Sequence, residues 1–296
     1  MTWKTIGMWA ALAGCTAPEA RMVEPVEVVR PAVRSAPEPL EWPESAAGLA
    51  ILPDRSCTDP KETVFLMAGH ANGRTRNGNT GVHGQIEAEV NLETALRLGA
   101  ALEATGCFEV VQGRTGDARP SYGSRIRHAE RIEADAFIEL HTDARGPIWA
   151  WADSPEGEVY RAAGALGFSV LYNERNHVPG IAAARRDLAR SVTRSLRAAH
   201  FEPFPAYAGM YDPDVEVGAH LDRRGLKMLR EPEVPSIIIE THNAKHFEES
   251  LRWREDRVHE AFAAAIADGL VTLFEGPAPA ASCTAQPVVS RSTAPR

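Results

Sequence analysis

The chain has 296 residues, of which 44% are hydrophobic, and a formal net charge of -8. This length and hydrophobic content can supply one substantial core, so we expect one globular domain with tails. The negative charge argues against a nucleic-acid-binding protein, since such proteins carry an excess of Lys and Arg that neutralises phosphates. An anionic partner held by a local basic patch stays compatible with this charge.

The first fifteen residues have the pattern of an export leader. Lys4 gives a positive start, and residues 6–14 form an apolar stretch that is too short to span a bilayer. The stretch closes in LAGC, residues 12–15, which resembles the lipobox of bacterial lipoproteins, where the cysteine is diacylated. We therefore expect lipidation at Cys15 and a periplasm-facing protein anchored to a membrane, with Thr16 in place of Asp favouring the outer membrane. The alternative is a cytosolic chain whose first residues have no such role.

Two further segments flank the predicted domain. Residues 16–56 are rich in Pro, Glu, Val and Ala without a sustained period, which is typical of an extended spacer. We expect the folded domain to span residues 57–275 and residues 276–296 to form a disordered tail. A spacer of this kind would hold the domain away from a membrane surface.

In chain order, the domain alternates strand patterns with helix patterns. Short apolar runs predict strands over residues 63–70, 108–114, 135–141, 167–172 and 232–240. Apolar residues at helical spacing predict helices over residues 87–106, 121–134, 181–200 and 243–274. Residues 145–165 have no regular pattern. The alternation predicts an α/β fold, a single domain whose mostly parallel, twisted sheet has helices on both faces.

Three of the predicted strands end in a residue that can bind a metal or move a proton. The first strand, TVFLMAGH, ends at His70, the third ends at His141 and the last at Glu240, while Glu87 begins the first helix. In open α/β sheets, ligands bind beyond the carboxyl ends of the strands. Two imidazoles and one carboxylate suit zinc, and a second carboxylate can serve as general base. The simpler interpretation of each histidine alone is a hydrogen-bonded loop residue, and Glu87 alone is favourable at a helix N-terminus.

The motifs around these four residues resemble the zinc-dependent N-acetylmuramoyl-L-alanine amidases of the bacterial cell wall, over residues 63–273. FLMAGHANG, EAEVNLETALRL, IELHTDA and PSIIIETHN occur in the order and spacing of that family. The resemblance implies that His70, Glu87 and His141 bind one Zn²⁺ and that Glu240 is the catalytic residue. The chain departs from the family in MAGH, where Asp-Pro-Gly-His is usual, and in THN after Glu240. These departures concern the pocket walls and the substrate preference rather than the reaction class.

Arg114 and Asn72 are candidate substrate-binding residues. Arg114 ends the second strand, where a guanidinium can bind an anionic group, and an ordinary surface arginine is the alternative. Asn72 lies two residues after His70, in a polar loop over residues 71–85 that is long for a strand-to-helix connection. Long loops at strand ends often carry function.

Five other residues are weaker candidates. His83, in the long loop, and His242, after Glu240, could support the site without binding the metal, whereas we expect His128 to be a solvated helix residue. Trp149 and Trp151 could form a lid over the crevice or belong to a satellite core.

Export would also place the cysteines in an oxidising compartment. Cys57 precedes the first predicted strand and Cys107 the second, so pairing of these strands would bring both to the same edge of the sheet. We expect a Cys57–Cys107 disulfide with Cys283 left over, and three free thiols are the alternative.

Together, the leader and the resemblance predict a lipid-anchored zinc hydrolase that cuts the amide between N-acetylmuramic acid and L-alanine in peptidoglycan, for cell-wall remodelling or daughter-cell separation. Peptidoglycan and the membrane are the expected partners, with an activator protein as a further candidate. Two alternatives are open. One is an inactive lipoprotein that binds peptidoglycan, and the other is a zinc amidohydrolase that acts on small N-acyl amino acids.

Overall fold

The computed structural model describes residues 57, 59–71, 77–116, 118–146, 148–154, 157–162, 165–205, 207 and 209–276, with backbone alone for 148–154 and 157–162. The predicted leader with Cys15, the spacer, the tail, Asn72 and Cys283 lie outside these residues. In the described part of the chain, no helix is both long and apolar enough to cross a membrane.

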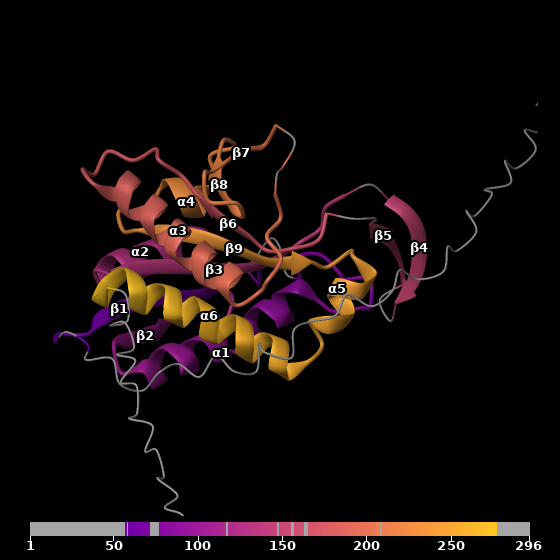
Figure 1. Cartoon of the computed structure of the whole chain (residues 1–296), viewed down its shortest axis with the longest axis horizontal. Helices are drawn as coiled ribbons and strands as arrows, with labels where there is room; N and C mark the ends of the chain where they lie inside the picture. Colours follow the sequence, from indigo (N-terminus) through magenta and orange to yellow (C-terminus); the bar gives the residue numbers. More distant parts are fainter. Residues whose placement is uncertain are drawn as a thin grey trace, which may run out of the picture. The chain divides into compact units, whose positions relative to one another are not determined.

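A seven-stranded sheet forms the centre of the domain (Figure 1). Its strands, in spatial order, are β2 (Phe108–Gln112), β1 (Glu62–Ala68), β3 (Ala136–Asp143), β9 (Ser236–Asn243), β6 (Ser169–Tyr172), β8 (Ala219–Asp222) and β7 (Tyr211–Pro213). The first four run parallel to one another, β6 is antiparallel to β9, and β7 is antiparallel to β8. The predicted α/β class and mostly parallel sheet are therefore confirmed.

The central strands are apolar on both faces because helices cover both faces. In β1, Val64 and Leu66 point into one core, which is filled by α1 (Glu87–Thr105), α3 (Ile181–Ala198) and α6 (Asp256–Glu275). Phe65 and Met67 point into the other, beneath α2 (Tyr122–Arg131) and α4 (Lys227–Arg230). Alternate residues of β3 and β9 divide between the two faces in the same way, so their last side chains on the α2 and α4 face share one edge of the sheet.

The helix boundaries follow local signals in the sequence. Helix α1 ends at Gly106, whose φ of 78° is in the left-handed region that glycine adopts without strain. Helix α2 begins after Ser121, whose side chain accepts a hydrogen bond from the backbone N–H of Ser124. Both boundaries agree with the helix ranges predicted from the sequence.

The structure corrects three sequence predictions. The single helix expected over residues 243–274 is wrong, because β9 continues to Asn243 and two helices follow, α5 (Phe247–Arg252) and α6. Residues 145–165, expected to be irregular, include an antiparallel hairpin of β4 (Ile148–Ser154) and β5 (Gly157–Ala162). Strands β7 and β8 and helix α4, of three or four residues each, were not predicted, because segments this short carry no measurable periodicity.

A disulfide joins Cys57 to Cys107, which are 50 positions apart in the sequence and have their Cα atoms 5.0 Å apart. Both cysteines lie where β1 and β2 begin, since Glu62 pairs with Phe108 at the start of the parallel ladder. The bond therefore links the segment that enters β1 to the segment that follows α1.

Candidate active site

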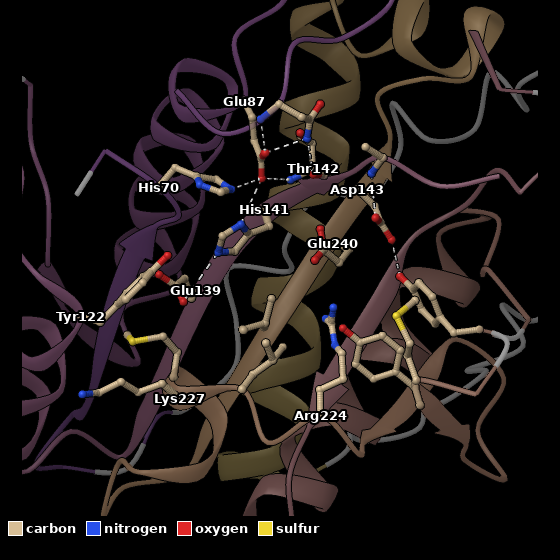
Figure 2. A pocket seen from close by; sticks show the side chains of 18 residues that line it. His70, Glu87, Tyr122, Glu139, His141, Thr142, Asp143, Arg224, Lys227 and Glu240 are labelled. Atoms are coloured by element: carbon tan, nitrogen blue, oxygen red, sulfur yellow. Dashed lines mark hydrogen bonds and ion pairs between the residues drawn. The ribbon is translucent and has the colours of Figure 1, made fainter. Parts of the chain in front are cut away.

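A cavity of about 520 Å³ lies at the carboxyl edge of the parallel strands, on the face that carries α2 and α4 (Figure 2). Its lining includes His70, Glu87, His141 and Glu240, the four residues that sequence motifs single out. The remaining walls come from α2, from α4 and from the segment that leads into β7. Parallel strands β1, β3 and β9 end side by side, which explains how residues so far apart in sequence meet there.

Three potential metal ligands converge on one point in this cavity. Nε2 of His70 lies 2.8 Å from Oε1 of Glu87, and Nδ1 of His141 lies 3.0 Å from the same oxygen. One ligand atom from each of the three residues lies within 4.8 Å of the others. Two imidazole nitrogens and a carboxylate oxygen that face one another form a donor set that fits zinc and leaves a position open for a reactant.

The backbone after β1 turns sharply to present the first of these ligands. His70 has a φ of 58° and Ala71 a φ of 44°, both in the left-handed region that side chains other than glycine rarely adopt. Such strain persists where surrounding structure holds it, and it is common at functional sites.

Glu87, the first residue of α1, is held by groups from two other segments. Its Oε2 accepts hydrogen bonds from the backbone N–H of Asn79 at 2.8 Å and from the Asn79 side chain at 2.6 Å. Its Oε1 accepts a longer bond from the backbone N–H of Thr142, at 3.3 Å. Burial raises the pKa of Glu87, but hydrogen bonds from His141 and His70 outweigh burial and hold this pKa below its usual range. Glu87 is therefore ionised, as a metal ligand must be.

Two glycines make room for the ligands. A Cβ atom on Gly69 would overlap the imidazole of His141 and lie 2.6 Å from the carbonyl oxygen of Leu140. A Cβ atom on Gly78 would overlap the carboxylate of Glu87 and lie 2.6 Å from Cδ2 of His70. Neither Gly78 nor Asn79 was a sequence candidate, because nothing local in a polar loop shows which of its residues fold back onto the site.

Glu240 has the surroundings of a proton acceptor. It follows the four buried residues that begin β9, and its Oε2 is buried without a hydrogen-bond partner among the described residues. Figure 2 shows its carboxylate in the cavity, between His141 and Arg224. Burial and then the negative charge of Asp143 raise the pKa of Glu240 to about 8 in the absence of metal, against the opposing charge of His141. An unpartnered carboxylate beside a metal site suits general base catalysis.

A half-buried hydrogen-bond network, which was not predicted from the sequence, lies next to Glu240. Asp143 accepts hydrogen bonds from the guanidinium of Arg145, at 2.7 Å, and from the hydroxyl of Tyr207, at 2.5 Å. The guanidinium of Arg145 lies 4.0 Å from the centre of the Phe204 ring. These contacts partly neutralise Asp143, so the network keeps a second carboxylate close to Glu240 without leaving its charge unpaired.

Arg114, expected to contact the substrate, is placed elsewhere. Its side chain is buried and donates to the carbonyl oxygens of Ala88, at 2.6 Å, and Ala68, at 3.5 Å. It is absent from the cavity lining among the described residues. The guanidinium therefore ties the start of α1 to the end of β1. A residue at a strand end reaches the cavity only from the correct face, which the sequence did not reveal.

The other histidine candidates also lie away from the cavity. Nε2 of His83 pairs with the carbonyl oxygen of Phe247 at 2.9 Å. His242 is 2% exposed and stacks on Trp253, with ring centres 4.6 Å apart. His128, expected to be solvated, is instead half-buried with its ring 5.1 Å from that of Phe65.

The two tryptophans proposed as a lid, Trp149 and Trp151, belong to β4. The structure does not describe their side chains, so the choice between lid and satellite core stays a prediction.

Comparisons with known proteins agree with this geometry. A family model described as N-acetylmuramoyl-L-alanine amidase matches residues 64–272. The chain is 26% identical over 214 residues to the amidase LytC of Bacillus subtilis, and 25% identical over 239 residues to the amidase AmiC of Escherichia coli. These matches cover 72% and 75% of this chain, but only 36% and 55% of the two relatives.

Among solved structures, the fold is similar to an N-acetylmuramoyl-L-alanine amidase from Clostridium difficile, with a TM-score of 0.56 and 21% identity. That match covers 73% of this chain and 97% of the other. Since the family model spans well over half of the sequence, the chain belongs to the N-acetylmuramoyl-L-alanine amidase family.

Proposed function

We propose that the chain is a zinc-dependent N-acetylmuramoyl-L-alanine amidase that hydrolyses the amide between N-acetylmuramic acid and L-alanine in peptidoglycan. One observation carries this proposal. The convergent ligands His70, Glu87 and His141 share a cavity with the unpartnered carboxylate of Glu240. A three-ligand site with an adjacent free carboxylate is the arrangement that metal-assisted amide hydrolysis requires.

In this mechanism His70, Glu87 and His141 hold the zinc ion. Zinc bound there would polarise the scissile carbonyl and favour attack by water. Glu240 accepts a proton from the attacking water and returns it to the nitrogen of the leaving amine. Oε2 of Glu240 is buried and makes no hydrogen bond among the described residues, so it is available to accept this proton. The hydrogen bonds from Asn79 hold Glu87 in one orientation, which would position a bound metal relative to this base.

The cavity wall opposite the metal ligands supports an anionic peptide as substrate. Arg224 and Lys227 are exposed and line the cavity, and the guanidinium of Arg224 lies 4.6 Å from the centre of the Tyr211 ring. Stacking on an aromatic ring restricts the side chain and directs its charge. We propose that Arg224 binds a free carboxylate of the stem peptide.

Export and lipidation at Cys15 are proposed from the leader, which lies outside the described residues. The Cys57–Cys107 disulfide supports this location, because disulfides persist in oxidising compartments. An enzyme that faces the periplasm would meet peptidoglycan directly.

The test is digestion of purified muropeptides by the zinc-loaded full chain, with products identified by mass spectrometry. We expect a peptide with free N-terminal alanine and a sugar that retains its lactyl carboxyl group. Binding of peptidoglycan without products would favour the inactive wall-binding protein. Hydrolysis of small N-acyl amino acids but not of muropeptides would favour the other amidohydrolase.

A further inference from the structure

Glu139 is a buried carboxylate next to the metal site that the mechanism above does not use. It lies on β3 two residues before His141, on the same face of the sheet, and is 1% exposed. Its Oε1 accepts a hydrogen bond of 2.6 Å from Nη1 of Arg125. Its Oε2 makes no hydrogen bond within the described part of the chain, and lies 3.6 Å from Nε2 of His141 (Figure 2).

The two nitrogens of His141 thus face two different carboxylates. Nδ1 faces the metal ligand Glu87 at 3.0 Å, and Nε2 faces Glu139. A neutral imidazole has one protonated nitrogen, and a nitrogen that binds metal must offer its lone pair. The group that accepts a hydrogen bond from one nitrogen therefore decides which nitrogen is free for the metal.

The geometry points to Glu139 as a positioning residue of the zinc centre, an inference that rests on the proposed function. With zinc bound, Nε2–H of His141 would donate a hydrogen bond to Oε2 of Glu139, which is 3.6 Å away in this structure, and this bond would fix the imidazole in the tautomer whose Nδ1 faces Glu87 and the metal position. A carboxylate would then orient His141 through the ring nitrogen that does not face the metal, as is usual for metal-binding histidines.

Arg125 explains how a carboxylate is tolerated at this depth. Its guanidinium is buried and donates to Glu139, to the backbone carbonyl of His70 and, from Nε at 3.2 Å, to the carbonyl of Pro120. It neutralises Glu139 and at the same time holds the strained turn at His70. One side chain from α2 thereby connects the strands that carry two of the three ligands.

The simpler interpretation is that Glu139 serves only as the counter-ion of Arg125. A guanidinium can bind both oxygens of a carboxylate, which is the strongest geometry for such a pair. Here one oxygen binds Arg125 and the other faces His141 without another partner in the described structure. This division is what a carboxylate that serves two groups would show.

Glu139→Gln separates the two interpretations. The amide has a single acceptor oxygen, which Arg125 would bind, so its NH₂ group would face Nε2 of His141 and favour the wrong tautomer. We expect zinc affinity, measured on the full chain by competition with a chelating dye, to fall roughly 10- to 100-fold. Glu89→Gln is the matched control, because Glu89 is exposed in the first turn of α1 and its change removes the same charge. It should leave affinity unchanged.

A second measurement needs no variant. In the zinc-loaded wild-type chain with ¹⁵N-labelled histidine, NMR should show His141 protonated at Nε2 and bound to the metal through Nδ1. Protonation at Nδ1, or equal zinc affinity in wild type and Glu139→Gln, would overturn the positioning role alone. A wild-type chain that binds no zinc at the site, judged against His141→Ala, would overturn the proposed function and this inference together.

Discussion

His141 and Glu240 are register partners on the neighbouring parallel strands β3 and β9. The backbone ladder between these strands therefore sets the distance between a proposed metal ligand and the proposed base. The register shifts immediately after this pair, between His141 and Asp143. A shift of register ends regular pairing and redirects the side chains that follow, which suits the rim of a catalytic site. The position of Glu240 relative to His141 thus depends on two paired strands rather than on a loop.

Gly69→Ala should disrupt the metal site without unfolding the domain. The new methyl group would overlap the imidazole of His141, so this ligand must move. We expect zinc affinity to fall by roughly 10-fold or more, because a displaced ligand loses most of its bond. Gly123→Ala is the control, since this helix position meets only the end of the flexible Arg127 side chain. Competition with a chelating dye measures the zinc affinity of both variants. Equal zinc affinities of Gly69→Ala and Gly123→Ala would show that His141 is free to shift.

Loss of the Cys57–Cys107 disulfide should destabilise the domain. The bond closes a loop of 50 residues, and removal of such a cross-link costs about 2–4 kcal/mol, mainly by freeing the unfolded chain. Urea unfolding of wild type and Cys57→Ser should reveal this difference. Intact masses after alkylation that are equal with and without reductant would show that no disulfide forms.

Arg224→Ala should weaken recognition of anionic substrates. Arg224 lines the cavity, whereas the neighbouring Arg223 pairs with Asp212 and is absent from the described lining. We expect kcat/KM for muropeptides with a free stem-peptide carboxylate to fall by roughly 10-fold in Arg224→Ala, with a weaker salt dependence. Arg223→Ala should stay near wild type. Equal effects of the two substitutions would argue against a specific contact.

Stability should depend on pH through Glu249. Burial raises the pKa of this carboxyl to about 7, although it accepts backbone hydrogen bonds from Gly167 and Asn243. A raised pKa means that folding favours the protonated form, so the contribution of Glu249 to stability is full below pH ~4.5 and is lost as pH rises toward ~7.

The difference in unfolding free energy between wild type and Glu249→Gln should therefore change by on the order of 3 kcal/mol across that window, in favour of the variant at higher pH. Urea unfolding at a series of pH values measures it. A difference that is constant with pH would contradict the raised pKa.

The convergence of His70, His141 and Glu240 on one cavity could be predicted from the sequence, because each motif combines a buried strand with a chemical group at its end. His70, His141 and Glu240 follow short apolar runs that are typical of central parallel strands, and the carboxyl ends of such strands meet at one edge of the sheet. The pairing of Cys57 with Cys107 follows from the same argument, applied to the opposite edge. In these cases the strand pattern in the sequence and the parallel arrangement of the strands place the same residues together.

The supporting residues could not be predicted in this way. Arg125 meets Glu139 because α2 packs against β3, and no spacing rule relates one face of a helix to a given residue of the strand that follows it. Asn79 and Gly78 reach Glu87 through the fold of a polar loop. The prediction that Arg114 contacts the substrate was wrong for a related reason, because a side chain at the end of a strand can point to either face of the sheet. The break between helices α5 and α6 was not predicted, because apolar residues continue at helical spacing across it. Trp253 is buried at this junction.

The most direct test of the account is the rate of muropeptide amide hydrolysis by Glu240→Gln at a zinc content equal to that of the wild type. The substitution preserves shape and breaks no hydrogen bond at Oε2 among the described residues, so it removes proton transfer alone. We predict that zinc and peptidoglycan binding persist while turnover falls by roughly 10²- to 10⁴-fold. A variant that turns over at the wild-type rate would contradict the central claim that Glu240 and the zinc ligands form one hydrolytic site.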